Sequence, residues 1–378
     1  MKREITNNRI AWVDAIKGIA MLLILMMHTG SDKGADIFSM SADHFFFRLG
    51  GNGWIGVVLF FLISGFLLYQ SLYTLFCKNN YSVFVIFNWI KRKFIRFIPL
   101  FYLALFIGFI WHAHYIWLKN IGQPSYENLF MHILFLHGFF PNYCANILGV
   151  EWYIGVLAIF ICIVPFLFKY INSLKKSIIV FIVSIPITYL ITTYLNTLKP
   201  TTLSPFVYQN YLNAFGIVEN VSTLLLGIVL YHVYHNLPNI SIRHKVLVSY
   251  ILLAISFILL IQNLYTQSTV LLMNTHTVWG IIFSLFIVSQ MIHENYFICY
   301  PFLKLIGQYS WPIYLFHFFI IHLYRKYQFF DIKYPLLNWF IEFTVIVCTS
   351  LLLSMILVKY FDKPLVSYLS KKLTSKQK

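Results

Sequence analysis

Long apolar stretches separated by short polar segments run along this chain. A membrane-spanning helix needs about 20 mostly apolar residues. The pattern predicts about ten such spans, near residues 10–29, 54–76, 97–117, 151–170, 176–195, 213–235, 246–263, 271–292, 305–324 and 337–359. The sequence therefore predicts an all-α fold, a polytopic bundle of transmembrane helices.

The segment 128–149 interrupts this pattern. Its first half is apolar, but the segment is broken by His132, His137, Pro141 and Asn142. An eleventh span here would also place Lys175, Lys176, Arg243 and Lys245 on the outer side, against the positive-inside rule. We expect a re-entrant or interfacial segment here rather than an eleventh span.

Composition excludes an ordinary soluble fold. Hydrophobic residues make up 60% of the 378 residues and charged residues only 11%, whereas a soluble domain has about a quarter charged residues. A soluble protein this apolar would expose aggregation-prone surface, but lipid is itself an apolar solvent. We expect one membrane domain over residues 1–365, followed by a short basic cytoplasmic tail over residues 366–378.

The formal charge of +16 is carried by short clusters between the apolar stretches. With ten spans, the larger clusters fall on one side, which the positive-inside rule makes cytoplasmic. Both termini should then be cytoplasmic, and the charge sets membrane orientation rather than indicating a nucleic-acid partner. The five cysteines are scattered, so neither a disulfide framework nor a metal site is expected.

The first predicted span contains three ionisable residues, Asp14, Lys17 and His28. Such residues inside a span are costly and often functional. Lys17 and His28 are eleven residues apart, so they share a helical face about 16 Å long, and Asp14 lies one turn before Lys17. A long anionic cofactor would suit this face. Interface anchoring by Asp14 and Lys17, and an ordinary interfacial role for His28, remain alternatives.

Two further segments carry polar or small residues at helical spacing. Ser64 and Gly65 permit close helix approach, for which simple packing is sufficient. Arg92 and Arg96 are four residues apart and share a helical face. Arginine binds phosphate through two parallel hydrogen bonds, although the pair also fits a plain positive-inside cluster.

The segment WVDAIKGIAMLLILMMH, residues 12–28, resembles the acyltransferase 3 family of bacterial membrane proteins. That family has an Asp, a basic residue, Gly-Ile-Ala and a His eleven residues after the basic one. The His is the family's proposed catalytic residue, and Lys17 stands where most members have Arg. The resemblance continues through FFLISGFLL and through the Arg92/Arg96 pair, which is followed by Pro99.

Three later segments extend the resemblance over nearly the whole chain. EWYIGVLAIFICIVP places Trp152 and Pro165 at the family's spacing, with Leu157 where many members have Glu and with Glu151 nearby. LIGQYSWPIYLFHFFII resembles the family's Gly-x-x-Ser-Tyr-x-x-Tyr-Leu-x-His segment, and YFDKP resembles its closing acidic-x-Pro signature.

The resemblance implies transfer of an acyl group, often acetyl, from cytoplasmic acetyl-CoA to a hydroxyl of a cell-surface glycan or lipid-linked saccharide. The enzyme would be a multi-pass protein of the bacterial inner membrane, acting alone or with a separate periplasmic partner. The candidate residues are His28 and Asp14 for catalysis, Lys17, Arg92 and Arg96 for the donor, and Trp152, Glu151, Ser310, Tyr314 and His317 for the substrate site.

A flippase or exporter of a glycan precursor is the alternative function. Polytopic topology and buried charge fit both functions. A clamp for the phosphates of CoA, formed by Lys17, Arg92 and Arg96, has no special use in a transporter, and this feature favours the acyltransferase.

Overall fold

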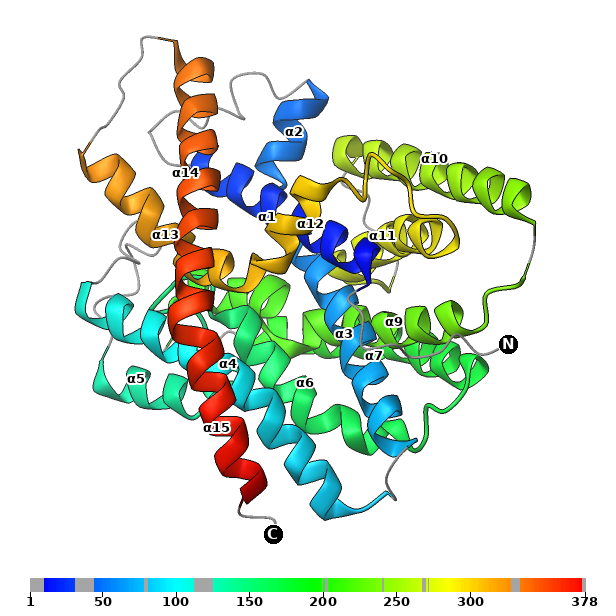
Figure 1. Ribbon diagram of the computed structural model, residues 1–378, viewed down its shortest axis with the longest axis horizontal. Helices are drawn as coiled ribbons and strands as arrows, with labels where there is room; N and C mark the ends of the chain where they lie inside the picture. Colours follow the sequence, from blue (N-terminus) through cyan, green and yellow to red (C-terminus); the bar gives the residue numbers. More distant parts are fainter. Residues whose placement is uncertain are drawn as a thin grey trace. The chain divides into compact units, whose positions relative to one another are not determined.

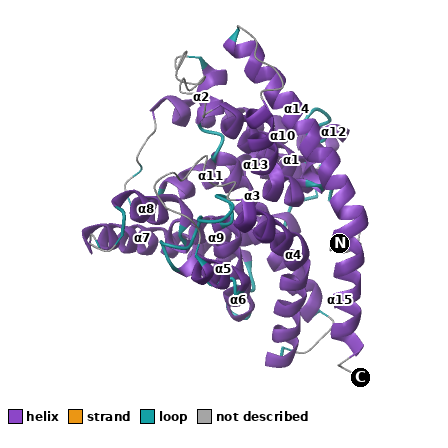
Figure 2. Cartoon of the chain, turned by 90° about the vertical axis from the view of Figure 1, so that its left-hand side faces the viewer, coloured by secondary structure: helices purple, strands orange, loops and turns teal. Residues whose placement is uncertain are grey.

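The computed structural model describes residues 10–30, 44–77, 81–111, 125–198, 200, 203–239, 241–266, 270, 272–327 and 334–375. Within these ranges all regular structure is helical, and no strand is present (Figure 2). This part of the chain contains eight helices long and apolar enough to cross a membrane. The all-α, multi-pass membrane fold is confirmed, whereas the count of ten spans and the cytoplasmic termini stay predictions.

The chain divides into two compact units. Unit 1 comprises residues 1–78 and 163–308, and unit 2 comprises residues 79–162 and 309–378. Each unit is built from two separate segments of the sequence. No single point of the chain therefore divides the predicted domain 1–365 into these units.

Unit 1 is a bundle of helices packed through small residues. Its helices are α1 (Ala11–Gly30), α2 (Phe45–Gly51), α3 (Ile55–Phe76), α7 (Leu174–Leu198), α8 (Pro205–Asn210), α9 (Ile217–His235), α10 (Ile242–Thr266), α11 (Thr275–Ile292) and α12 (Pro301–Gln308). A π-helical turn, Tyr211–Phe215, precedes α9. Helix α1 packs on α3 and α12, α3 packs on α9, and α9 packs on α7 and α11.

Glycines set the closest approaches in unit 1. A Cβ on Gly65 in α3 would overlap the carbonyl oxygen of Leu224 in α9, and one on Gly227 would overlap that of Leu62. Close backbone approach through small residues is the usual way helices associate in membranes, where the hydrophobic effect does not drive contact. The packing role expected for Gly65 is thereby confirmed.

Unit 2 contains α4 (Val83–Trp111), α5 (Tyr126–Ile133), a short 3₁₀ turn (His137–Phe139), α13 (Ser310–Tyr327), α14 (Pro335–Leu357) and α15 (Lys363–Ser375). The boundary between the units falls inside α6 (Trp152–Phe168). A π-helical turn, Val358–Asp362, joins α14 to α15, and Figure 1 shows them as one continuous rod. The expected basic tail therefore begins inside a helix, and α15 packs on α4.

Two predicted spans differ from the helices that contain them, and residues 112–117 of the span expected at 97–117 lie outside the described residues. The span expected at 97–117 belongs to a helix that already begins at Val83, because the basic stretch before it is helical too. The exposed Lys91 and the half-buried Lys93 lie over the rings of Phe87 and Trp89, at 4.4 and 5.0 Å. Aromatic faces of this kind stabilise cations inside an otherwise apolar helix.

The span expected at 305–324 is not a single helix. Helix α12 ends at Gln308 and α13 begins at Ser310. Pro312 has no backbone N–H to bond the carbonyl of Gln308, which favours a break here and a new helix with proline in its first turn. The segment 128–149, in contrast, forms no helix of spanning length.

Candidate functional site

Helix α1 carries the first three candidate residues along one uninterrupted length. Asp14 lies in its first turn and His28 in its last, and both are buried, while Lys17 is half-buried. Because α1 is continuous from Ala11 to Gly30, Lys17 and His28 keep the predicted common face and separation of about 16 Å.

Contacts in unit 1 fix α1 at both ends. Near its start, a Cβ on Gly307 of α12 would overlap the carbonyl oxygen of Asp14, and one on Gly18 would overlap that of Leu303. Near its end, a Cβ on Gly53 would overlap the carbonyl oxygen of Leu23. The residue after Gly53 is Trp54, the N-cap of α3, and it thus lies beside the end of α1 that carries His28.

A buried polar cluster lies next to Trp54, and sequence reasoning missed it. The ring of His276 stacks on Trp54 with centroids 5.2 Å apart. Its Nδ1 lies 2.6 Å from Oδ1 of Asn220, and its backbone N–H donates to Oε1 of Glu219 at 3.0 Å. Glu219, Asn220 and His276 are all at most 4% exposed.

The hydrogen bonds of Asn220 determine the tautomer of His276. The amide nitrogen of Asn220 donates to the carbonyl oxygens of Ala214 and Gly216, at 2.7 and 2.8 Å. Its Oδ1 is therefore the acceptor, so Nδ1 of His276 must carry the proton. The signal in the sequence was available: Glu219 and His276 are ionisable residues within predicted spans, the same criterion that selected Asp14.

In unit 2 the paired arginines lie on α4. Arg92 and Arg96 are both exposed, as a shared face on one helix predicts. Arg96 interacts electrostatically with Asp362, the acidic residue of the YFDKP segment. The turn Val358–Asp362 packs on α4, which brings together two motifs more than 260 residues apart in sequence.

Glu151 belongs to a second buried polar cluster, which lies in unit 2. Its Oε1 accepts the backbone N–H of Ile147 at 2.6 Å and lies 3.3 Å from Nε2 of His132. The rings of His132 and His137 stack 4.3 Å apart and nearly parallel. All three ionisable side chains are completely buried.

The hydrogen bonds of this cluster locate its protons. Nδ1 of His132 lies 2.7 Å from the carbonyl oxygen of Asn128 and must donate to it. Its Nε2 faces Oε1 of Glu151 across 3.3 Å. Burial opposes a charged Glu151, but the contacts with His132 and Ile147 outweigh it and lower its pKa.

His137 differs from its neighbour. Its Nε2 lies 3.0 Å from the carbonyl oxygen of Glu151 and donates to it. Burial, together with the nearby His132, lowers the pKa of His137 to about 3, so this ring is neutral. The sequence showed these histidines only as interruptions of an apolar stretch, and no periodicity indicated that one of them would contact Glu151.

The remaining candidate substrate-site residues lie close to this cluster in unit 2. Tyr314 donates its hydroxyl proton to the carbonyl oxygen of Val150 at 2.8 Å, so it is adjacent to Glu151. His317, one turn later, is buried, with Nδ1 2.8 Å from the carbonyl oxygen of Tyr314. Trp152 and Ser310 are also buried. Unit 2 thus brings together residues from two separate predicted motifs.

The candidate residues are divided between the units. Unit 1 holds Asp14, Lys17 and His28, and unit 2 holds Arg92, Arg96 and the five candidate substrate-site residues. Each unit also contains one buried glutamate that contacts a histidine, Glu219 in unit 1 and Glu151 in unit 2.

Comparison with known proteins gives one match. The family model described as "Acyltransferase domain" matches residues 10–359, nearly the whole chain. No curated protein and no solved structure matches it.

Proposed function

The chain belongs to the acyltransferase 3 family, and we propose that it transfers an acetyl group from cytoplasmic acetyl-CoA to a hydroxyl of a cell-surface glycan. The transfer takes place at the outer face of the bacterial inner membrane. The observation that carries the proposal is the buried His28 in the last turn of α1, on the face it shares with Lys17.

His28 is the general base of this mechanism. It accepts the proton of the acceptor hydroxyl as the hydroxyl oxygen attacks the thioester carbonyl carbon, and the proton then passes to the departing thiolate. The carbon–sulfur bond breaks and a carbon–oxygen bond forms. The C-terminal end of a helix carries partial negative charge, which stabilises an imidazolium formed there.

Within unit 2, Arg92 and Arg96 bind phosphates of the donor, and within unit 1, Lys17 is the residue that this proposal assigns to the donor. Arg92 and Arg96 are exposed and one helical turn apart, a spacing that suits two neighbouring phosphate groups. Asp14, one turn before Lys17, orients the lysine. The carbonyl of Asp14 is in turn held against Gly307.

Residues near Glu151 serve the acceptor. Trp152, Glu151, Ser310, Tyr314 and His317 are the candidates, and the Glu151–His132 pair holds this region in one conformation. Networks of buried, hydrogen-bonded polar groups are suited to such rigid positioning.

The test is transfer of labelled acetyl from CoA to glycan in membranes that contain the protein, compared with membranes from cells lacking it. Translocation of the unmodified glycan precursor is followed in the same membranes. Protein-dependent label in the glycan supports the proposal. Protein-dependent translocation without label would contradict it and support the exporter.

A further inference from the structure

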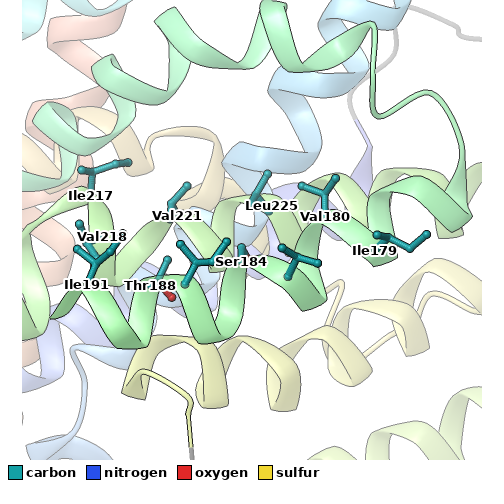
Figure 3. Close-up of a pocket in the computed structure, with 11 residues that line it drawn as sticks. Ile179, Val180, Ser184, Thr188, Ile191, Ile217, Val218, Val221 and Leu225 are labelled. Carbon is teal, nitrogen blue, oxygen red and sulfur yellow. The ribbon is translucent and has the colours of Figure 1, made fainter. Parts of the chain in front are cut away.

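Helices α7 and α9 of unit 1 form a groove of about 470 Å³ (Figure 3). This volume lies within the range of small-ligand sites, about 300–1,000 Å³. Both helices are long and apolar enough to cross a membrane. Aliphatic side chains form its walls, among them Ile179 and Ile191 of α7 and Ile217 and Leu225 of α9.

The few hydroxyl groups of the groove have hydrogen-bond partners. Ser184 donates to the carbonyl oxygen of Phe181 at 2.7 Å and lies 3.0 Å from the hydroxyl of Ser222. Thr188 donates to the carbonyl oxygen of Ile185 at 3.0 Å. An occupant therefore need not form hydrogen bonds in the middle of the groove, which suits a hydrocarbon chain.

The length of the groove matches one leaflet. Ile179 and Ile191 are twelve residues apart on α7, about 18 Å at the helical rise. Half of a bilayer core is about 15 Å thick. An occupant that lies along the groove is thus about as long as one leaflet is thick, a length that a lipid chain can match.

The two ends of the groove differ in polarity. Beside Ile191, the hydroxyl of Thr192 is buried without a hydrogen-bond partner. At the same end, the first turns of α9 carry Glu219 and Asn220, which bind His276 beside Trp54. Buried polar groups without partners are rare in proteins, and each calls for an explanation such as a bound water or a catalytic role.

Two more unpartnered polar atoms lie beside His276. The amide nitrogen of Asn274 and the hydroxyl of Thr277 are buried and have no hydrogen-bond partner. Through Trp54 and Gly53, this end of unit 1 is also the end of α1 that carries His28. The groove thus runs from an apolar end to the polar end that holds the proposed general base.

We propose that this groove binds the hydrocarbon chain of a lipid-linked saccharide and so directs its polar head to the His28 end of unit 1. The inference rests on the proposed function and adds to it that the acceptor is modified while attached to its membrane lipid. The chain extends toward Leu225 and Ile179, and the saccharide emerges beside Ile217.

The test compares a groove variant with a matched variant on the same bundle. Val221→Phe fills the groove, because Val221 lines it. Ile182→Phe adds the same ring to an exposed position of α7 that does not line it. Both proteins are placed in nanodiscs and given acetyl-CoA with either a lipid-linked saccharide or the same saccharide without its lipid.

Val221→Phe should raise KM for the lipid-linked acceptor about tenfold, the loss expected when roughly two methylene groups no longer fit. Its KM for acetyl-CoA and its activity on the lipid-free saccharide should stay at wild-type values, and Ile182→Phe should resemble wild type throughout. Equal KM values for the lipid-linked acceptor in Val221→Phe and wild type would overturn the inference.

Binding is measured separately from activity, with a photoreactive lipid-linked saccharide. We expect labelling on α7 and α9 that Val221→Phe removes and that excess plain phospholipid does not compete away. Full competition by phospholipid would mean that the groove takes bulk lipid only. If binding is specific but no acetyl is transferred, the proposed function fails while the assigned lipid site stands.

Discussion

The two buried glutamates show how differently the two units are built. In unit 1, Glu219 accepts a backbone N–H at the start of α11, as a helix-capping group does. In unit 2, the carboxylate of Glu151, just before α6, faces the side chain of His132 in the last turn of α5. Folding of unit 1 therefore requires only an acceptor oxygen at the position of Glu219. Folding of unit 2 also requires the negative charge of Glu151.

The packing of the two units differs in emphasis, since unit 2 also has a close glycine contact, between Gly138 and Gly155, and unit 1 also has a left-handed residue, Leu272. Unit 1 is held by long helices that meet at glycines, and its geometry follows from backbone contact. Unit 2 depends on a turn-rich segment that includes Phe135 and Gly149, both with left-handed backbone conformations (φ of 58° and 80°). Left-handed φ is unusual for a bulky residue such as Phe135. The aromatic ring of Phe135 packs on Phe94 and Phe101, which holds it in place.

Loss of the Glu151 carboxylate should give the largest effect on folding. Glu151→Ala leaves His132 without its buried partner, and breaking such a pair costs about 3–5 kcal/mol. Thermal unfolding of the purified protein in detergent measures the change. The double variant Glu151→Leu with His132→Leu should recover much of the loss, since no lone buried charge remains.

Glu219→Gln in unit 1 is the matched control, because an amide oxygen can still accept the N–H of His276. It should unfold close to the wild-type temperature, whereas Glu151→Gln should not. Equal destabilisation by the two Gln variants would contradict the distinction between the units.

Changes to the exposed arginines of unit 2 should act on donor binding rather than folding. Removing Arg92 or Arg96 deletes a charge-assisted contact and should weaken acetyl-CoA binding roughly ten- to hundredfold. Lys93, which lies over Trp89, serves as the control and should change affinity much less when replaced by Ala. Unchanged donor affinity, with altered membrane insertion in all three variants, would favour a purely topological role for these cations.

Adding a single methyl group where α12 packs on α1 in unit 1 should lower the stability of the protein. Gly307→Ala places a Cβ against the carbonyl oxygen of Asp14, and overpacking of this kind typically costs about 1–3 kcal/mol. At Gly280 a Cβ would meet its nearest neighbours at 3.5 Å, an ordinary contact. Gly280→Ala should therefore unfold like wild type, and a similar loss in both variants would show that glycine packing does not set this interface.

The sequence predicts the structure of unit 1 better than that of unit 2. An apolar stretch of helical length predicts α1, and the position of Lys17 and His28 on one face follows from helical geometry alone. The contact between His132 and Glu151 depends on the turns between them, whose left-handed residues no hydrophobic period encodes. The break at Tyr309 was not predicted, because Pro312 lies in an otherwise apolar stretch. The Glu219–His276 cluster was not predicted, because its two residues lie in different predicted spans.

The central claim, that His28 is the base for acetyl transfer, is tested most directly by His28→Ala in purified, nanodisc-embedded protein. Labelled acetyl transfer and acetyl-CoA binding are measured on the same sample and normalised to folded protein. General-base assistance is typically worth 10²–10⁴-fold in rate. We predict a loss of that size in transfer, with donor affinity unchanged, because phosphate binding is assigned to Lys17, Arg92 and Arg96. Transfer by His28→Ala at a rate near wild type would contradict the mechanism.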